Sequence, residues 1–374
     1  MIHDKFTCSR CILTIKDSPS IVFNSKGICN YCLYYDSLIK SLGSEFERKQ
    51  WIDTKIIEIK KYGQKKKYDC ILGISGGIDS TYLSYWAKQN NLRPLVVHFD
   101  NGWNSELAAE NIKNICEKLD FNLHTYVINW DEFKALQVAY LKAGVVDIEA
   151  ITDHAIMATI FRYATKYKIK YILSGFNYAT EAIMPKEWIF DKTDSRNIFH
   201  IFSSYENLLK LKSYPHLSFF KKLYNHWVHK IESVQVLNYI NYNKFVAKEL
   251  IIKELAWRDY GGKHHESIFT KFYQNYILPE KYKIDKRKAH LSSLINSGQI
   301  TKEIAQKIIT EPLFESENQK LLLKTYVLKK LELSEHEFDK ILHNTIRNHN
   351  DFKTEKKLWE FYFLIIKIFK FWKA

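Results

Sequence analysis

Four short apolar runs, rich in β-branched residues, alternate with longer segments of mixed polarity through the middle of the chain. The runs are DCILGIS, PLVVHFD, NLHTYVI and YILSG, and their length and composition predict buried strands. The segments between them predict helices over residues 80–90, 106–119 and 153–167, and a polar helix over 45–62 precedes the first strand. Since strands that alternate with helices form parallel sheets covered on both faces, the pattern predicts an α/β fold with a doubly wound parallel sheet.

The hydrophobic pattern changes at both ends of this α/β segment. After about Pro185 the chain consists of long, aromatic and lysine-rich stretches that predict helices without clear strands. The first 35 residues, in contrast, contain paired cysteines and predict a small metal-binding knuckle. We therefore expect three loosely bounded parts: an N-terminal cysteine knuckle over 1–40, the α/β domain over 41–185, and a helical substrate or partner region over 186–374.

The composition is that of a globular protein with a basic surplus. The 374 residues include 46% hydrophobic and 26% charged positions, which argues against a disordered, collagenous or coiled-coil chain. The 56 lysines and arginines exceed the 42 acidic residues by 14, which points to a phosphate-bearing ligand. Charge alone does not distinguish among a nucleotide, an RNA and a lipid surface.

Neither end of the chain predicts a targeting or membrane-spanning segment. Residues 1–15 carry charges and cysteines where a signal peptide would need an apolar stretch, so we expect a cytoplasmic protein. No apolar run reaches the length of about 18 residues that a membrane span requires. The tail over 359–372 predicts a helix docked on the core, with Lys367, Lys370 and Lys373 on one side. Peripheral membrane contact through this C-terminal helix is one alternative, and a partner-binding helix is another.

Four of the six cysteines form two CxxC pairs near the N-terminus. Cys8 and Cys11 are separated from Cys29 and Cys32 by 17 residues, which is a spacing typical of four-cysteine zinc sites. Because four thiolates complete a tetrahedron around Zn²⁺, no coordination position would remain for water, and the metal would be structural. An iron–sulfur cluster and disulfides are the alternatives.

The segment that follows the first predicted strand has the properties of a phosphate-binding loop. Gly76 and Gly77 allow a sharp turn that directs backbone N–H groups toward an anion. The hydroxyls of Ser75 and Ser80 add donors, and the start of the next helix adds the positive end of its dipole. Asp79 would repel phosphate unless it holds Mg²⁺ or caps the loop. The sequence matches neither the GxxxxGK[ST] loop nor the GxGxxG fingerprint.

Polar residues also follow the later strands, at the edge where open α/β sheets bind ligands. His98 and Asp100 end the second strand, in the segment HFDNG, although a structural Asp-Asn-Gly turn is the alternative. The fourth predicted strand is followed by Gly175, Asn177 and Glu181. We expect these side chains to lie beside the phosphate-binding loop.

The second half of the chain supplies cationic candidates. Lys263 lies in the turn GGKHHES with His264 and His265, and Lys286 and Arg287 begin the run KRKAH. The lysines and the arginine are predicted to reach a polyphosphate or an anionic sugar. A solvated basic helix face and RNA contact are the alternatives.

The start of the helix predicted from residue 153 is ambiguous. Asp153 and His154 are candidates for contact with substrate or metal. A helix cap made by Thr152 and Asp153 explains the same residues almost as well.

SGGIDS after a first strand is the signature of the PP-loop ATP pyrophosphatases, and the chain resembles that superfamily, with its HUP-like fold. Across nearly the whole length, the order of further segments resembles one group, the N-acetyl sugar amidotransferases of lipopolysaccharide O-antigen, other surface-polysaccharide and flagellin-sugar biosynthesis. The segments are the cysteine knuckle, HFDNGWNS, TDHA, SGFNYATEAIMP, WRDYGGKHHES and FTKFYQNYILPEKYKIDKRKAHLSSLINSGQIT. The last two are specific to that group.

The resemblance implies a two-step reaction with ATP and Mg²⁺, beside a structural Zn²⁺. ATP would adenylate the acetamido oxygen of an N-acetylated nucleotide sugar or nonulosonic acid and release pyrophosphate; ammonia would then displace AMP and leave an acetamidino sugar. The residues that would bind ATP are Gly73, Ser75, Gly76, Gly77, Asp79, Ser80, His98, Asp100, Gly175 and Asn177. Those that would act in catalysis are Asp79, Lys263, Lys286 and Arg287. Those that would bind the substrate are Asp153, His154, Glu181, His264 and His265.

The chain contains no recognisable glutaminase. It lacks a GxCxG-type nucleophile elbow, and no cysteine stands at residue 1 or 2. The resemblance therefore implies that a separate glutaminase subunit, accompanied by a cyclase-like subunit, delivers the ammonia. Ammonia taken from solution is the alternative.

A tRNA-modifying PP-loop thiolase is the main alternative function, because it would explain the basic charge, the knuckle and the loop equally well. That chemistry usually needs a persulfide-carrying cysteine or an iron–sulfur cluster near the loop. Cys70 and Cys116 lie in strand-like and helix-like patterns that favour core packing, and neither belongs to a CxxC. The segment over 257–301 also does not resemble an RNA-binding module. We therefore favour sugar amidation over thiolation and over other ATP-dependent amidations, and we expect no nucleic-acid partner.

Overall fold

A five-stranded parallel sheet forms the centre of the first half of the protein. The computed structural model describes residues 6–262 and 265–371. The strand order is β3-β2-β1-β4-β5, and all neighbouring strands are parallel. The strands are β1 (Cys70–Ile74), β2 (Pro94–Asp100), β3 (Leu123–Val127), β4 (Tyr171–Leu173) and β5 (Glu232–Val234). The predicted parallel sheet is therefore confirmed. The carboxyl ends of its strands lie along one edge.

Helices cover both faces of the sheet, as the doubly wound pattern predicts. On β1, Cys70, Leu72 and Ile74 pack into a cluster with helices from one face. Those helices are α2 (Glu45–Gly63), α3 (Ile78–Gln89), α4 (Glu106–Leu119) and α10 (Lys244–Leu255). Ile71, which points the other way, packs against Ile160 of α6 (Ala150–Lys166) on the opposite face.

The prediction that the chain has no strand after Pro185 was wrong. β5 lies in that region and extends the sheet, with Glu232 in register with Tyr171 of β4. It is an edge strand of three residues, and only Val234 is buried. A strand so short carries no readable alternation of polar and apolar residues, so its presence depends on pairing with β4.

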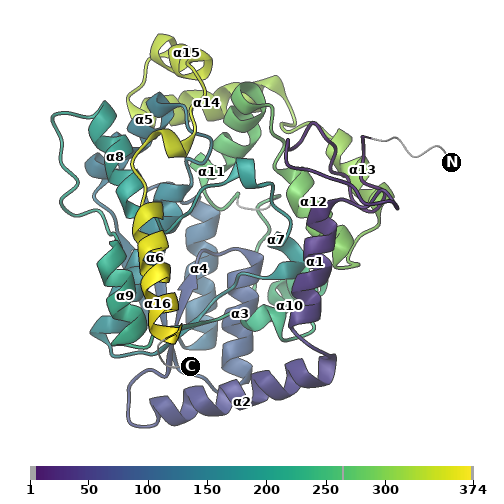
Figure 1. Cartoon of the computed structure of the whole chain (residues 1–374), viewed down its shortest axis with the longest axis vertical. Coiled ribbons are helices and arrows are strands. Elements are labelled where there is room, and N and C mark those ends of the chain that lie inside the picture. The colour runs from purple at the N-terminus through teal and green to yellow at the C-terminus, as the bar shows by residue number, and fades with distance from the viewer. Residues whose placement is uncertain (1–5, 263–264, 372–374) are drawn as a thin grey trace.

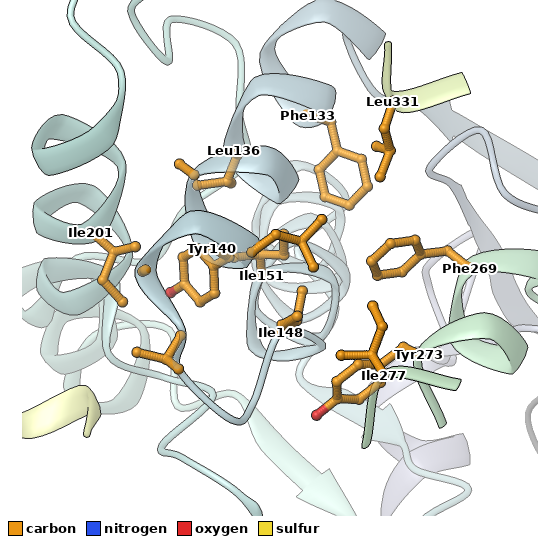
Figure 2. Close-up of a cluster of buried hydrophobic side chains, with 14 of the residues drawn as sticks. Phe133, Leu136, Tyr140, Ile148, Ile151, Ile201, Phe269, Tyr273, Ile277 and Leu331 are labelled. Carbon is orange, nitrogen blue, oxygen red and sulfur yellow. The ribbon is translucent and has the colours of Figure 1, made fainter. Parts of the chain in front are cut away.

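The helices of the second half share a hydrophobic core with the α/β segment. The buried cluster in Figure 2 joins Phe133 and Tyr140 of α5 (Trp130–Ala143) and Ile151 of α6 to Phe269 and Tyr273. Further contributors are α8 (Ser195–Tyr205), α11 (Ile268–Phe272), the π-helix η3 (Tyr273–Tyr282), α14 (Glu317–Leu331) and α15 (Glu335–His343). Because one buried cluster includes side chains from both halves, the helical region packs directly against the α/β segment.

The N-terminal knuckle packs beside the same edge of the sheet. It continues into α1 (Asn30–Ser41), and its buried cluster includes Ile183, which follows the short helix α7 (Tyr178–Glu181). The Lys302 ammonium donates to the Cys8 carbonyl oxygen at 2.6 Å, which joins the knuckle to α13 (Lys302–Thr310). Asn296, the last residue of α12 (Arg287–Asn296), donates to the Cys32 sulfur at 3.2 Å. The knuckle therefore supports α7 and α12.

The remaining elements complete the outer layer. They are η1 (Lys186–Trp188), α9 (Phe219–Trp227), η2 (Val236–Asn238), η4 (His349–Asp351) and α16 (Lys356–Phe371). α9 and α16 lie side by side, and the rings of Phe219 and Trp359 meet edge to face with centroids 4.9 Å apart (Figure 1). Within the described ranges, every helix is too short or too polar to cross a bilayer.

Candidate active site

The loop between β1 and α3 has the geometry of an anion-binding turn. Gly76 has a φ of +85°, and a Cβ built on it would come within 3.2 Å of the Ala108 carbonyl oxygen, so the position requires glycine. The Ser75 hydroxyl accepts from the Gly77 N–H at 3.2 Å and closes the turn. Among the described residues, no side chain caps α3 at Gly77. The first N–H groups of this twelve-residue helix are therefore placed to meet an anion.

Two aromatic side chains from a distant segment hold the loop in place. The indole N–H of Trp257 donates to the Gly76 carbonyl oxygen at 2.7 Å, and the hydroxyl of Tyr260 donates to the same oxygen at 2.8 Å. Trp257 is among the largest fully buried side chains of the protein. These bonds fix the peptide after Gly76 and explain why the segment WRDYGG lies beside the loop.

A tyrosine from a distant segment contacts Asp79. The hydroxyl of Tyr242 donates a hydrogen bond to the Asp79 carboxylate. Burial and the charge of Asp79 raise the pKa of Tyr242 far above its usual value of 10, so the phenol stays protonated and acts as a donor. Asp79 also lines the cavity in front of the loop.

A first cavity of about 410 Å³ lies in front of the loop, on the side of α10. Ser75, Asp79 and Gly175 form one wall, and Lys244 and Lys248 of α10 form another. Lys248 pairs with the Asp259 carboxylate at 2.5 Å, which holds the ammonium at the rim. This cavity joins a turn rich in N–H donors to two lysines and therefore suits a polyphosphate.

A second cavity of about 590 Å³ lies on the other side of the loop, over the carboxyl ends of β1 and β2. Part of its wall is apolar, formed by Val97, Phe99, Ile156, Ile160, Met184 and Ile189. Its polar end is formed by Glu149, Thr152, Asp153, Lys192, Lys286 and His290. Four residues line both cavities, and they are Ser75, Phe176, Glu181 and Glu266. The two cavities therefore meet at the loop.

Ion pairs organise the polar end of the second cavity. The Lys286 ammonium lies 2.7 Å from the Glu149 carboxylate, and both side chains are at most 14% exposed. The Lys192 ammonium lies 2.9 Å from carboxylate oxygens of both Asp147 and Asp153. Burial lowers the pKa of Lys192, but these two carboxylates, Asp153 first, outweigh burial and raise it above its usual value. Sequence reasoning missed Lys192, because only its tertiary position beside Asp153 distinguishes it from other lysines.

Of the residues predicted at the end of the second strand, one lines a cavity and the other has a structural position. His98 lines the second cavity; its Nδ1 lies 3.0 Å from the Ile74 carbonyl oxygen and its Nε2 lies 2.8 Å from the Asn104 amide nitrogen. These partners assign the proton to Nδ1. Asp100 instead accepts from the Gly102 N–H at 2.8 Å, which supports the structural turn.

The two predicted glycines and Glu181 line the cavities, whereas Asn177 has a structural role. Gly73 lines the second cavity, and Gly175 lies against the start of α3 and lines the first. Asn177 is fully buried and caps α7 by accepting from the Thr180 N–H at 2.9 Å, so its side chain positions the backbone. Glu181, at the end of α7, faces both cavities.

Two predicted site residues are occupied elsewhere in the fold. His154 is fully buried; its Nδ1 lies 2.8 Å from the Lys192 carbonyl oxygen and its Nε2 accepts from the Leu217 N–H at 3.0 Å. The guanidinium of Arg287 pairs with Asp285 at 2.7 Å and donates to carbonyl oxygens at the end of α13. Both side chains connect structural elements, and neither lines either cavity.

The other residues predicted in and near the basic segments lie in different environments. Asp153 lines the second cavity, but α6 begins at Ala150, so the alternative of a cap at Thr152 and Asp153 does not hold. His265 donates its backbone N–H to the Gly262 carbonyl oxygen at 3.4 Å beside the first cavity. Lys263 and His264 lie outside the described residues.

The four knuckle cysteines form one buried cluster. Their sulfur atoms all lie within 4.8 Å of one another, with Cys8 and Cys32 at 3.9 Å and Cys11 and Cys29 at 3.8 Å. These distances exclude disulfides, whose sulfur atoms lie about 2.05 Å apart. They match the edge of about 3.8 Å that Zn–S bonds of about 2.3 Å produce in a tetrahedron. The four-sulfur donor set therefore fits a single structural Zn²⁺ with no open position.

Comparisons with known proteins identify two regions. Residues 266–365 match a family described as "LPS biosynthesis protein WbpG-like, C-terminal domain", and residues 69–181 match "Queuosine biosynthesis protein QueC". The solved structures that are similar include NMN synthetase from Francisella tularensis, at 15% identity and a TM-score of 0.27, covering 35% of this chain and 56% of that one. Another is the NH3-dependent NAD synthetase from Campylobacter jejuni subsp. jejuni NCTC 11168, at 14% identity and 0.28, covering 35% and 58%. The chain thus spans less than two thirds of either synthetase, and no curated protein sequence matches it significantly.

Proposed function

We propose that this chain, which matches QueC over residues 69–181 and a WbpG-like C-terminal domain over residues 266–365, is a PP-loop ATP pyrophosphatase that uses ATP to amidate an N-acetylated sugar. In this reaction, the acetamido oxygen attacks the α-phosphorus of ATP, and pyrophosphate leaves. Ammonia then adds to the imidate carbon, and the oxygen departs with AMP. The products are AMP, pyrophosphate and an acetamidino sugar.

The observation that carries the proposal is the junction of the two cavities at the Ser75–Ser80 loop. The first cavity offers N–H donors and two lysines to a departing pyrophosphate. The second offers an apolar wall to a nucleoside and a polar end to a sugar. An ATP molecule that spans the junction would place its α-phosphorus between the leaving-group side and the sugar, which is the alignment that an in-line displacement needs.

The residues at the junction receive the following roles. The N–H groups at the start of α3, with Lys244 and Lys248, neutralise the charge that develops on pyrophosphate. Asp79, oriented by Tyr242, would hold Mg²⁺, which supplies charge neutralisation to the phosphates when bound. Glu181 faces both cavities and takes a proton from the attacking ammonia. Lys263 remains a predicted phosphate ligand.

The polar end of the second cavity supports recognition of a sugar. The pairs Lys286–Glu149 and Lys192–Asp153 present donors and acceptors side by side, and a sugar's hydroxyl groups need both. The apolar wall near Ile156, Ile160 and Met184 excludes water from the activated carbon, since hydrolysis there would waste ATP. The substrate is an N-acetylated nucleotide sugar or nonulosonic acid.

The ammonia comes from a separate glutaminase subunit with a cyclase-like companion, because the chain has no glutaminase motif of its own. The purified chain should therefore use ammonium and fail to use glutamine. Equal turnover with glutamine alone would contradict this part of the proposal.

The cysteines count against the thiolase alternative. Cys70 is fully buried and burial raises the pKa of its thiol well above the usual value of 9.0. Burial likewise raises the pKa of Cys116 to about 11. Neither thiol is accessible or ionised at neutral pH, as a persulfide carrier would need to be.

The decisive experiment measures pyrophosphate release with ATP, Mg²⁺ and ammonium against a panel of N-acetylated nucleotide sugars and nonulosonic acids. We expect release to depend on one acetamido sugar and the product to be one mass unit lighter than the substrate, since NH replaces oxygen. Stimulation by tRNA in place of the sugar would favour the thiolase and refute the proposal.

A further inference from the structure

An exposed aromatic stripe runs along α9 at the edge of the molecule. Phe220, Tyr224, Trp227 and Val228 recur at the spacing of one helix face and are 55–74% exposed. Isolated exposed apolar residues are common, but a row of four on one helix face marks a surface that contacts something apolar.

The stripe continues onto α16. Phe361 and Leu364 are 64% and 55% exposed. The two helices are joined by a hydrogen bond of 2.8 Å from the Trp227 indole N–H to the Tyr362 hydroxyl, and they lie side by side in Figure 1. The exposed apolar residues of α9 and α16 therefore belong to one surface, which we call the aromatic patch.

Basic residues flank the aromatic patch at the amino ends of the strands. Lys65, Lys66 and Lys67 precede β1, Lys168 and Lys170 precede β4, and Lys230 precedes β5. The segments 61–68, 162–170 and 219–231 contain no aspartate or glutamate. Since the strands are parallel, these lysines gather at one edge of the sheet, opposite the phosphate-binding loop.

Direct contacts connect these segments. The Lys66 ammonium donates to the Lys168 carbonyl oxygen at 2.9 Å, and the rings of Tyr68 and Tyr167 meet edge to face at 5.6 Å. Thr165, near the end of α6, donates to the Asn225 side chain of α9 at 3.5 Å. The basic edge and the aromatic patch are therefore contiguous.

We propose that this surface binds the face of a bilayer that carries anionic lipids, with the aromatic patch inserted among the headgroups and the lysines on the phosphates. Aromatic and aliphatic residues together on the patch fit the interface of a bilayer, and the acid-free flanks complement its negative charge. Because the basic edge lies opposite the carboxyl ends of the strands, both cavities would stay open to solvent while the protein is bound. This inference is independent of the sugar substrate proposed above.

The test is sedimentation of the full chain with vesicles of phosphatidylglycerol and phosphatidylcholine, or of phosphatidylcholine alone. We expect binding to the anionic vesicles only, weakening as salt is raised. The pair Phe220→Asp and Phe361→Asp should lower the partition coefficient about tenfold for each phenylalanine. The triple Lys65→Glu, Lys168→Glu and Lys230→Glu should lower it at least about a hundredfold, at about fivefold for each lysine.

Matched controls carry the same changes on the far side of the fold. Leu321→Asp with Leu322→Asp alters exposed leucines of α14, and Lys307→Glu, Lys329→Glu and Lys340→Glu alters three exposed lysines. Both controls should bind vesicles as the wild type does. Patch variants that bind like the wild type, or equal binding to phosphatidylcholine alone, would overturn the proposal. So would either of two other findings: an RNA that binds through the same lysines while vesicles do not bind, or a dimer that the phenylalanine pair dissociates.

Discussion

The hydroxyl of Tyr242 donates to the carboxylate of Asp79, although the two residues are 163 positions apart in the sequence. Tyr242 follows β5 and is 6% exposed, so it fixes the direction of the Asp79 side chain from outside the loop. The carboxylate that would hold Mg²⁺ therefore depends on the second half of the chain for its orientation.

Replacing Tyr242 by phenylalanine should lower sugar-dependent pyrophosphate release by about tenfold or more, since a hydrogen bond to a charged group contributes about 1.5–3 kcal/mol. The Mg²⁺ concentration for half-maximal rate should rise at the same time, because the carboxylate loses its orientation. Asp79→Ala should abolish turnover. Tyr82→Phe, whose ring lies 5.4 Å from that of Tyr242, is the matched control and should stay active. An unchanged Mg²⁺ dependence in the Tyr242 variant would contradict an orienting role.

Removing metal from the knuckle should destabilise the protein and loosen the active-site helices. The purified chain should contain about one Zn²⁺, which is bound by the four-cysteine cluster. A chelator or Cys29→Ser should lower the unfolding temperature, and the loss of support for α7 and α12 should weaken ATP binding. Cys116→Ser, outside the cluster, should retain the metal. A chain that keeps its unfolding temperature without zinc would refute the structural role.

The protein should lose stability as the pH falls below about 6.5. Burial lowers the pKa of His154 to about 4, and burial together with Lys192 lowers the pKa of His349 to about 3. Both pKa values lie below the usual 6.5, so just below pH 6.5 these histidines bind protons in the unfolded chain but not in the folded chain. Protonation at Nε2 would also remove the acceptor that each ring offers to a backbone N–H.

Urea unfolding between about pH 6.5 and 5 measures this effect before most carboxylates titrate. The free energy of unfolding should fall by about 1.4 kcal/mol per pH unit for each histidine once the pH is well below 6.5. His349→Gln should be less stable at pH 7.5 but should show a shallower slope. The same slope in the variant and the wild type would contradict the assignment.

The ion pair between Lys286 and Glu149 should contribute more to activity than to the free energy of unfolding. In the Lys286→Met variant, the largely buried Glu149 carboxylate loses its ion pair with the lysine. The variant should therefore be less stable and less active than the wild type. Adding Glu149→Gln should recover much of the stability, because the lone charge is removed, but not the activity. Double-mutant analysis of urea unfolding and pyrophosphate release separates the two effects. Recovery of full activity in the double variant would exclude a role in substrate binding.

Much of the fold could be predicted because its signals are local. The runs CILGI and PLVVHFD became β1 and β2 almost residue for residue, and the predicted helix over 106–119 coincides with α4. The three-residue β5 was not predicted, because a strand of that length forms only where a neighbouring strand pairs with it. The helix α5 between β3 and α6 was likewise not predicted, although its buried face contributes much of the core in Figure 2.

The candidate site also has features that the sequence predicts and features that only the tertiary structure shows. The turn at Gly76 and the cysteine cluster depend on short spacings, so both could be predicted from the sequence alone. Lys192 and Tyr242 reach the site from segments that show no catalytic pattern of their own, and the contacts of Trp257 and Tyr260 with the loop were not predicted. A cation or hydroxyl becomes part of a site through the partners that burial brings near it, and those partners are remote in sequence.

The sequence by itself therefore determined the parallel α/β order, the anion-binding turn and the four-sulfur cluster, since each is set by periodicity or spacing within a few dozen residues. Tertiary structure alone decided that Arg287 and His154 serve packing while Lys286 faces the cavity with Glu149. Adjacent residues on a helix point in different directions, and the nearest carboxylate or carbonyl oxygen determines what each charge does.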